Sequence, residues 1–399
     1  MFMSKIFDGL RVLDCSQFIS GPWTGIFFTD QGAEVIKVEP PPFGESFRYF
    51  VLYDKTMFPL FSILNRGKKS VSLDLRKEEA QKVFKKLVER SDVIIENFVK
   101  GTMEKWGIGY EVLKKINPKL IYAKISGYGN EGLEEYTNKT AFDIIIQAEA
   151  GILNALGFKE GPPRLPIADY TAGHIAAIGI SQALYYREKT GLGQFIDISM
   201  HDIMFAINVR AQVKEFIPLA SKIDIGGKFL PVYNQYNTKD NKKIVFTTLT
   251  ENQWVRLCEN VLRKPELLKD PRFDNIIKRF SYVDELDKII EEWTNTVTRG
   301  EAINQLNEFR IPCGKTLTIN EVHNHPNLKA RGMLCDQFDF TKWGVEKATI
   351  PNRLINFSET KGSIDAPGPE YGANNKDIYC GLLGYTNEDL KKWKHNKII

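Results

Sequence analysis

The sequence predicts an α/β fold with a Rossmann-like large domain, because short apolar strand segments alternate with helical segments over the first third of the chain. A change to hairpin and helix patterns near residue 226 predicts a second, smaller α+β domain. A chain of 399 residues has room for two domains of ordinary size. We place the large domain at 1–210 and 332–399, and the small domain at 226–323.

Each predicted element of the large domain depends on a local pattern. A helix is expected at Glu78–Arg90, where apolar side chains recur at helical spacing. Gly21-Pro22 is expected to separate the first strand from a helix at Trp23–Asp30. Strands are expected where runs rich in β-branched and apolar residues stand between turn residues, at Leu10–Cys15, Val35–Glu39, Ser70–Leu73, Val93–Ile95, Leu120–Ile125 and Phe195–Ser199.

The later elements follow from the same kind of pattern. A hairpin is predicted at Tyr233–Thr248, with its turn at Thr238-Lys239-Asp240-Asn241. Helices are predicted at Glu251–Leu262 and Val283–Thr294, and a short polar helix at Thr386–Lys394. The tail from about residue 332 is expected to return to the large domain.

The turn after the first strand excludes one common function of a Rossmann-like sheet. Its sequence, Ser16 to Pro22, contains no GxGxxG fingerprint. A dinucleotide site needs those glycines so that the backbone can approach the pyrophosphate. The sequence therefore argues against an NAD or FAD dehydrogenase.

Composition limits the remaining classes of protein. A net charge of +4 argues against a dedicated nucleic-acid binder, and no apolar run approaches the roughly 20 residues of a membrane span. The five cysteines form no CxxC pair, and no signal peptide is visible, so we expect a cytoplasmic protein with free thiols. His323 and His325 have no adjacent cysteine or carboxylate cluster, so we predict no metal site.

The most informative segment is Ile167–Gly179, in which Asp169 stands at the start of a run of small and apolar residues. The run predicts a closely packed helix. The carboxylate has two interpretations. It can cap the helix by accepting free backbone N–H groups, or it can act as a nucleophile that forms an acyl intermediate.

Ordered motifs along almost the whole chain resemble the class III CoA-transferases, the CaiB/BaiF group of carnitine, bile-acid and formyl-CoA transferases. The Asp169 segment is one of these motifs. Others are Leu13-Asp14, Gly21-Pro22, Gly32–Pro40, Asn65–Ser70, Leu73–Leu75, Glu96–Phe98, Gly101, Asn117-Pro118, Ser126–Gly129, Gln147-Ala148, Arg187–Gln194, Asp270–Phe273, Ala330–Met333, Pro369–Gly372 and Leu383–Tyr385.

The resemblance implies transfer of CoA from an acyl-CoA donor to a free carboxylic acid, with Asp169 as the catalytic nucleophile. The intermediates it implies are an aspartyl–acyl anhydride and an aspartyl-CoA thioester. CoA and acyl-CoA enter as substrates, and no permanently bound cofactor or metal is required. The family also implies an interlocked homodimer of this chain. No residue selects the donor or the acceptor acid.

CoA contacts are implied by position in the family. They are Gln17, Phe18, Leu73, Arg76, Asn97, Phe98, Lys105 and Lys139. The cationic side chains suit phosphate oxygens, and Leu73 and Phe98 suit the faces of an adenine. Arg48 is a further candidate for a phosphate, because Pro40-Pro41-Pro42 stands where some members carry an arginine. Met200 and His201 are candidates for the acyl pocket.

The same comparison of motifs shows one departure from the formyl-CoA transferases and bears on two alternatives to a transferase. Only Gly226-Gly227 remains of the glycine-rich loop of the formyl-CoA transferases, which argues against formyl or oxalate specificity. The α-methylacyl-CoA racemases place His-Asp where this chain has Phe142-Asp143, and a phenylalanine cannot exchange a proton. A CoA-binding protein without catalysis is the other alternative, and the presence of Asp169 argues against it.

Overall fold

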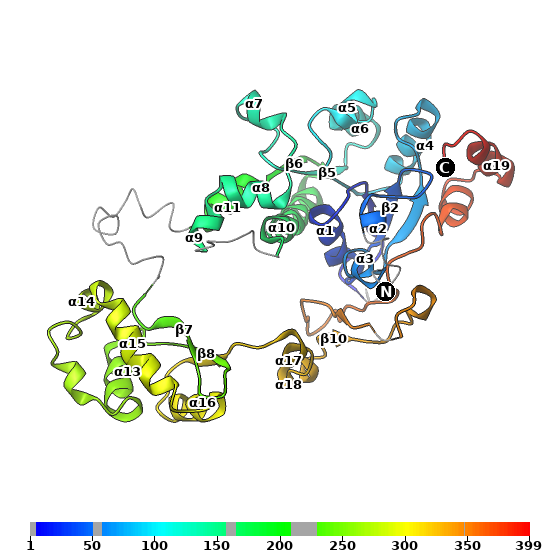
Figure 1. The fold of residues 1–399 in the computed structure, drawn as a ribbon. Coiled ribbons are helices and arrows are strands. Elements are labelled where there is room, and N and C mark those ends of the chain that lie inside the picture. The colour runs from blue at the N-terminus through cyan, green and yellow to red at the C-terminus, as the bar shows by residue number, and fades with distance from the viewer. Residues whose placement is uncertain (1–4, 51–57, 157–164, 209–229, 347) are drawn as a thin grey trace. The chain divides into compact units, whose positions relative to one another are not determined.

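The computed structural model describes residues 5–50, 58–156, 165–208, 230–346 and 348–399. The chain divides into two compact units. The first contains residues 1–154, 158–208 and 329–399, and the second contains residues 155–157 and 209–328 (Figure 1). The first unit is therefore made from both ends of the chain, and the second is made almost entirely from the segment between them.

A six-stranded parallel sheet forms the centre of the first unit, in the order β3-β2-β1-β4-β5-β6. This is the strand order of a Rossmann fold, and it confirms the predicted α/β class. The order reverses between β1 and β4, which pair directly with each other in the middle of the sheet. The strands are β1 (Arg11–Asp14), β2 (Glu34–Glu39), β3 (Lys69–Ser72), β4 (Val93–Glu96), β5 (Ile121–Ser126) and β6 (Phe195–Ser199).

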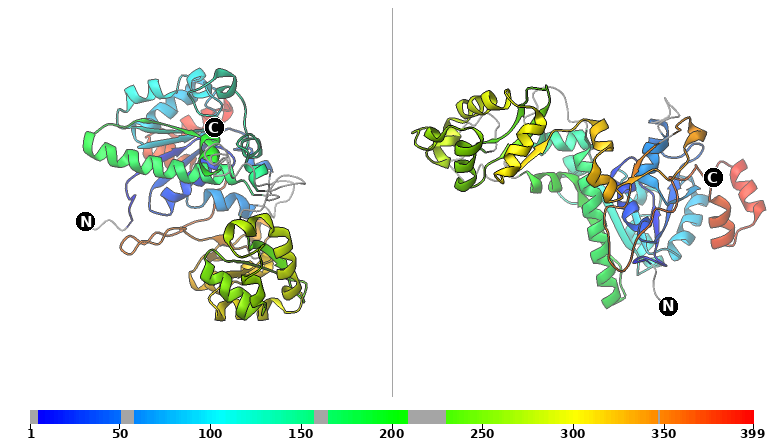
Figure 2. Two further views of the ribbon diagram at one scale, coloured as in Figure 1. Left: turned by 90° about the vertical axis from the view of Figure 1, so that its left-hand side faces the viewer. Right: turned by 90° about the horizontal axis from the view of Figure 1, so that it is seen from below.

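Helices cover both faces of this sheet, as the views in Figure 2 show, with the long green helix α10 along one face. The helices that precede α10 are α1 (Ser20–Thr29), α2 (Phe47–Phe50), α3 (Phe58–Asn65), α4 (Glu78–Glu89), α5 (Thr102–Lys105), α6 (Tyr110–Ile116), α7 (Glu134–Thr137), α8 (Asp143–Glu149) and α9 (Ile152–Ala155). They are followed by α10 (Ile167–Thr190), α11 (Met200–Ile207) and, near the C-terminus, α19 (Asn387–His395).

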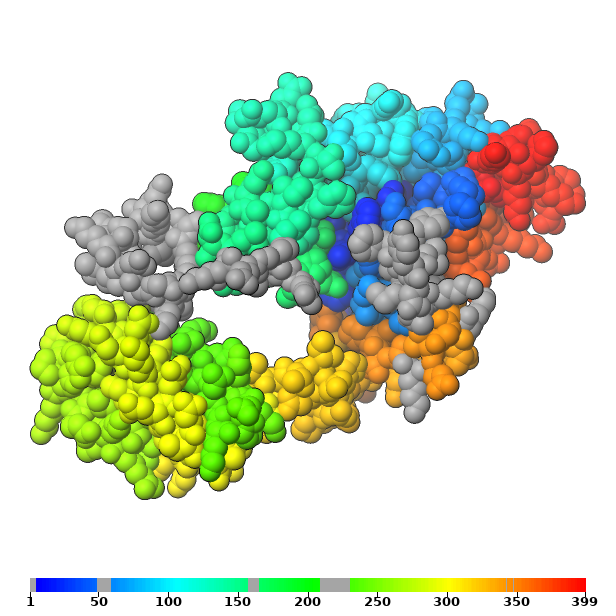
Figure 3. Space-filling model, viewed as in Figure 1, coloured from blue at the N-terminus to red at the C-terminus, as the bar shows by residue number. Residues whose placement is uncertain are grey.

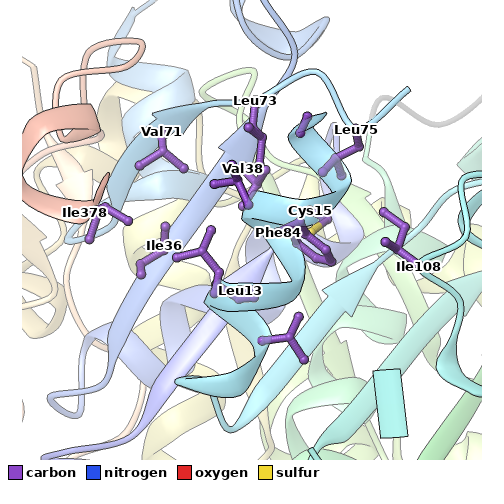
Figure 4. Packing of buried hydrophobic residues seen from close by; sticks show 14 of the residues in the cluster. Leu13, Cys15, Ile36, Val38, Val71, Leu73, Leu75, Phe84, Ile108 and Ile378 are labelled. Carbon is purple, nitrogen blue, oxygen red and sulfur yellow. The ribbon is translucent and has the colours of Figure 1, made fainter. Parts of the chain in front are cut away.

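Alternate side chains of the strands enter two separate cores, as the two-residue period of a strand requires. Val12 of β1 packs with α1, α8, α10 and α11, whereas its neighbour Leu13 packs with α4, α6 and α19. Figure 4 shows the second of these cores, with Leu13, Ile36 and Phe84 among its members. Helices α1 and α10 therefore share one face of the sheet.

The last part of the chain returns to the first unit. The backbone N–H of Asp74 donates to the carbonyl oxygen of Ile398 at 2.8 Å, and the indole N–H of Trp393 donates to Glu79 at 2.8 Å. Figure 3 shows these C-terminal residues, in red, against the light-blue surface around α4. The connecting segment contains a short antiparallel pair, β10 (Leu334–Cys335) and β11 (Ile350–Pro351), and a π-helical turn at Asp377–Leu382.

The second unit is an antiparallel sheet of β7, β8 and β9 packed with helices. Its core includes Tyr236, Phe246 and Trp254. The strands are β7 (Tyr233–Asn237), β8 (Lys243–Thr247) and β9 (Cys313–Lys315), and the helices are α13 (Glu251–Arg256), α14 (Ile276–Ser281), α15 (Val283–Thr294), α16 (Arg299–Glu308), α17 (Ile319–His323) and α18 (Pro326–Ala330).

Two predicted boundaries differ from the structure for identifiable reasons. Helix α1 begins at Ser20, before the expected break at Gly21-Pro22. A proline fits the first turn of a helix, because the N–H that it lacks would have no partner there. The helix expected at Glu251–Leu262 changes to a π-helical turn at Leu257–Val261. None of the helices in the described ranges has the length and apolarity needed to cross a bilayer.

Candidate active site

A pocket of about 230 Å³ lies in the first unit, outside the carboxyl ends of β1, β4 and β5. The loop after β1 contributes Gln17 and Phe18, and the loop after β4 contributes Asn97 and Phe98. Ligands of open α/β sheets bind at this place, where the order of the strands reverses. Asp169, in the first turn of α10, lines the same pocket, which we call the Asp169 pocket.

The two loops are joined by the Asn97 side chain. Its Oδ1 accepts the backbone N–H of Gln17 at 2.8 Å, and its Nδ2 donates to the carbonyl oxygen of Gln17 at 2.8 Å. The same Nδ2 lies 3.4 Å from the hydroxyl oxygen of Ser20. Asn97 therefore holds the loop after β1 in place, in addition to any contact that it makes with a ligand.

Phe18 has a backbone conformation that is rare for a residue with a side chain. Its φ is +61°, and its backbone N–H donates to Glu45 at 2.8 Å. Its ring meets the ring of Phe142 edge to face, with centroids 5.8 Å apart. Such strained residues persist where surrounding contacts enforce them, and they concentrate at functional sites.

Beneath this loop lies a group of buried charges. Lys68 donates to Asp14 at 2.7 Å, and Lys37 lies 2.9 Å from Glu45 and 3.8 Å from Asp14. Burial opposes ionisation of Asp14, but the two ammonium groups outweigh it and lower the pKa of Asp14 to about 2. Burial lowers the pKa of Lys68 to about 8. Because Glu45 also holds Phe18, this group supports the shape of the loop.

Asp169 is a half-buried carboxylate whose pKa is higher than that of an ordinary aspartate. Burial, together with the negative charge of Asp143, raises the pKa of Asp169 to about 7, although a hydrogen bond with the Ser20 hydroxyl lowers it. A carboxylate with this pKa is a stronger base than an ordinary aspartate and is still ionised in a large fraction of molecules at neutral pH. The site thus contains a group suited to nucleophilic attack.

The N-terminus of α10 is capped from a different helix. The residue at its N-cap is Pro166, which has no capping side chain, and Asp169 lies inside the first turn. The carboxylate of Asp143, on α8, accepts the backbone N–H groups of Ala168 at 2.8 Å and Asp169 at 3.1 Å. The interpretation of Asp169 as the cap is therefore wrong, because Asp143 already fills that role.

Small residues let α10 lie close to α1. A Cβ atom added at Gly173 would come within 2.8 Å of the carbonyl oxygen of Ser20 and 2.9 Å of Trp23. Ala168, Ala172 and Ala176 are fully buried on the same helix. The expectation of a closely packed helix is confirmed, and the close packing brings Ser20 to Asp169.

The structure places the eight expected CoA-contact residues in two groups. Gln17, Phe18, Asn97, Phe98 and Lys139 line the Asp169 pocket. The others, Leu73, Arg76 and Lys105, are not among its lining residues.

Each residue of the second group has other surroundings. Leu73 is 1% exposed in the core beside α4, so in this conformation its side chain offers no face to an adenine. Arg76 is paired with Asp74 at 2.7 Å, and Lys105 is exposed at the end of α5.

The other candidates divide in the same way. Met200 lines the pocket, whereas His201 lies against the ring of Tyr128, with centroids 5.6 Å apart. Arg48 makes a two-point ion pair with Glu39, at 2.6 and 2.8 Å, so its guanidinium is already neutralised. The Gly226-Gly227 segment lies outside the described residues.

Residues that the sequence analysis did not assign complete the pocket. They include Ser20, whose hydroxyl makes a hydrogen bond with Asp169, and Lys100, whose ammonium donates to Thr137 at 3.2 Å. One signal in the sequence could have indicated an outside cap: Pro166 precedes the helix and has no oxygen acceptor in its side chain. No three histidine, cysteine, aspartate or glutamate side chains gather into a possible metal site in the described ranges.

Comparison with known proteins agrees with this geometry. The sequence matches the profile of CoA-transferase family III over residues 7–375. It is 33% identical to the succinyl-CoA–D-citramalate CoA-transferase of Chloroflexus aurantiacus over 98% of both chains. It is 35% identical to the acetyl-CoA:oxalate CoA-transferase of Acetobacter aceti, over 82% of this chain and 85% of that protein.

A solved structure agrees as well. The crystal structure of a CaiB/BaiF family protein from Brucella suis has a TM-score of 0.78 and 30% identity, covering 95% of this chain and 99% of that one. The Rossmann-type unit and its pocket thus occur in a chain of CoA-transferase type. The protein belongs to CoA-transferase family III and is an enzyme that transfers CoA, which confirms the resemblance found in the sequence.

Proposed function

We propose that this enzyme moves CoA between two carboxylic acids through covalent intermediates on Asp169. The observation that carries the proposal is the position of Asp169 in the pocket at the strand-order reversal, with a pKa of about 7. Its carboxylate is the only carboxylate among the described lining residues of this pocket. Phe142, which also lines the pocket, has no proton to exchange, so the arrangement favours transfer over racemisation.

The first half of the proposed reaction consumes the donor. An Asp169 oxygen attacks the thioester carbonyl of the acyl-CoA, the C–S bond breaks, and CoA leaves as the thiolate. The product on the enzyme is an aspartyl–acyl anhydride. The thiolate then attacks the Asp169 carbonyl carbon, which releases the donor acid as a carboxylate and leaves an aspartyl-CoA thioester.

The second half reverses these steps with the acceptor. The acceptor carboxylate attacks the aspartyl-CoA carbonyl, and the CoA thiolate leaves again. The thiolate then attacks the acceptor's carbonyl carbon in the new anhydride, which forms the new acyl-CoA and restores the Asp169 carboxylate. No water and no net proton are consumed, so a pocket that excludes water protects the intermediates from hydrolysis.

CoA is proposed to contact the loops that line the pocket. Lys139 lies over the ring of Tyr136, 4.1 Å from its centroid, and its ammonium can pair with a phosphate oxygen. We expect Lys139→Ala to raise the KM for acyl-CoA more than kcat falls. Lys105→Ala, a change outside the lining of the pocket, is the comparison that separates pocket contacts from general surface charge.

Short carboxylic acids are the proposed acceptors, with succinyl-CoA as the first donor to test. The support comes from relatives named for succinyl-CoA with D-citramalate, L-malate or mesaconate, at 32–34% identity over 91–98% of this chain. An acetyl-CoA:oxalate relative adds acetyl-CoA and oxalate to the panel. Product analysis with each donor and acceptor pair identifies the pair that this enzyme prefers.

A homodimer of interlocked chains is proposed as the working assembly. Helix α10 exposes large apolar side chains, among them Ile178 at 52% and Tyr185 at 65%. Exposed apolar groups of this size are costly on a monomer and are typical of interfaces. Light scattering coupled to gel filtration measures the mass in solution, and a monomer at assay concentration contradicts this part of the proposal.

The deciding experiment is intact-protein mass spectrometry after mixing with the acyl-CoA panel. Hydroxylamine traps the aspartyl thioester or anhydride, and peptide mapping locates the trapped group. We expect it on Asp169 and expect no trapping in Asp169→Asn, whose amide is not a nucleophile. Exchange of the α-proton of the acyl group into heavy water, without trapping, supports the racemase alternative. Absence of both signals contradicts catalysis through Asp169.

A further inference from the structure

The motif Phe142-Asp143 has no role in the reaction as described, yet Asp143 lies beside the proposed nucleophile. Its carboxylate Oδ1 holds the backbone N–H groups of Ala168 and Asp169, at 2.8 and 3.1 Å. These N–H groups are two of the free donors at the start of α10, where no side-chain cap is present at Pro166. Asp143 thus fixes the turn of backbone from which the Asp169 side chain projects.

The other oxygen of Asp143 is also occupied. The amide Nε2 of Gln147, one turn later on α8, donates to Oδ2 at 2.5 Å and to the carbonyl oxygen of Leu165 at 3.1 Å. Each of these partners donates to Asp143, which favours its ionised form, although burial raises the pKa of Asp143. The Asp143 side chain is therefore held in place by hydrogen bonds, and its charge is close enough to raise the pKa of Asp169.

Charged groups near the first turn of α10 come from several elements, and the ammonium groups of Lys100 and Lys139 line the same pocket as Asp169. Helix α1 contains no charged residue. Helix α8 contributes Asp143 and, at its far end, Glu149, and the first turn of α11 contains His201 and Asp202. Within α10 itself, Tyr170 follows Asp169. Asp143 is the charge that opposes ionisation of Asp169, and Ser20 is the donor that favours it.

We propose that Asp143 is a positioning residue that activates Asp169: its hydrogen bonds orient the nucleophile, and its charge destabilises the free Asp169 carboxylate relative to the acylated one. Acylation converts Asp169 from an anion into a neutral anhydride or thioester. The repulsion between the two carboxylates therefore disappears when the acyl or CoA group is attached. This role depends on the covalent function proposed above, and it explains why a second carboxylate, that of Asp143, lies beside Asp169.

Two substitutions separate the charge from the cap. Asp143→Asn keeps an oxygen that can accept both backbone N–H groups and removes the charge. The Gln147 amide can rotate to present its Oε1, which has no partner in the described structure, to the new amide nitrogen. Asp143→Ala removes both the charge and the acceptor. Asp92→Asn is a matched control, because Asp92 also accepts a backbone N–H, that of Arg11 at 2.8 Å, but does not line the pocket.

The test measures trapped acyl-enzyme and its rate of formation by rapid quench, from pH 5.5 to 9, with saturating acyl-CoA. For Asp143→Asn we expect the pH midpoint to fall by about one unit, since a nearby charge commonly shifts a pKa by that much. The ratio of acylated to free enzyme at equilibrium above pH 8 should fall about tenfold, because one pKa unit corresponds to a factor of ten in an equilibrium constant. Asp143→Ala should in addition slow acylation by roughly a hundredfold, the cost of a misplaced nucleophile.

Each result has a defined meaning. An Asp143→Asn enzyme with the pH midpoint and the acylated fraction of the wild type overturns the proposed role of the charge. Slow acylation in Asp143→Ala beside an Asp143→Asn enzyme with the wild-type rate and pH midpoint shows a cap alone, and it also overturns the proposed role of the charge. If wild-type enzyme shows no trapped group on Asp169, the covalent function itself fails, and that outcome is separate because it does not depend on either variant.

Discussion

Replacing Asp169 with asparagine should abolish CoA transfer and at the same time stabilise the folded protein at neutral and alkaline pH. The pKa of Asp169 is about 7 in the folded protein, against the ordinary aspartate value of 3.8. Below about pH 4 the carboxyl group is protonated in both the folded and the unfolded chain, so it adds no pH-dependent term. Between pH 4 and pH 7 the unfolded chain releases this proton first, and the folded state loses stability relative to it.

The magnitude follows from the size of the shift. Three pKa units correspond to about 4 kcal/mol, and water in the pocket reduces this, so we expect about 2–4 kcal/mol above pH 7. Asparagine keeps the size of the side chain and an oxygen that can accept the Ser20 hydrogen bond, but it cannot ionise.

Urea unfolding of wild type and Asp169→Asn at pH 4.5 and pH 8 measures the difference. The variant's advantage should be small at pH 4.5 and large at pH 8. An advantage that is equal at both values, or a less stable variant at pH 8, refutes the argument that Asp169 is a destabilised carboxylate.

Three further predictions test the surroundings of Asp169. Gly173→Ala should lower the free energy of unfolding by about 1–3 kcal/mol, measured in urea, and reduce CoA transfer, because the new methyl group meets the Ser20 carbonyl oxygen. Gly179→Ala, on the same helix with its nearest neighbour at 3.4 Å, should instead raise the free energy of unfolding by up to about 1 kcal/mol. A similar loss of stability at both sites contradicts this reasoning. Ser20→Ala removes a hydrogen bond that lowers the pKa of Asp169, so the acidic limb of the pH–rate profile should move to higher pH by roughly one pH unit. An acidic limb at the wild-type pH contradicts the proposed effect of this hydrogen bond. Asp14→Asn leaves the buried Lys68 without its carboxylate, whereas Lys37 keeps Glu45, and it should cost about 3–5 kcal/mol at pH 7, with the loss shrinking as pH falls toward 2. The loss is measured as a lower melting temperature, and an unchanged melting temperature contradicts a structural role for the Asp14–Lys68 pair.

Much of the fold could be predicted because its strands and helices depend on local sequence patterns. The strands of the parallel sheet were placed to within a residue or two, because short runs rich in β-branched and apolar residues mark them in the sequence. Helix α15 has the predicted bounds, Val283–Thr294. The start of α1 was misplaced because Gly21-Pro22 is compatible both with a break and with the first turn of a helix, and only packing against α10 selects between them.

The sequence by itself determined the α/β class, the family and the presence of one aspartate at the start of a helix of small residues. These features depend on residue type and local order, which a sequence contains directly. Only the tertiary structure decided what surrounds that aspartate. Asp143 stands 26 positions before Asp169 and Ser20 lies far earlier in the chain, yet both reach the carboxylate. The pKa of Asp169 depends on distances across helices α1, α8 and α10, and no local pattern encodes those distances.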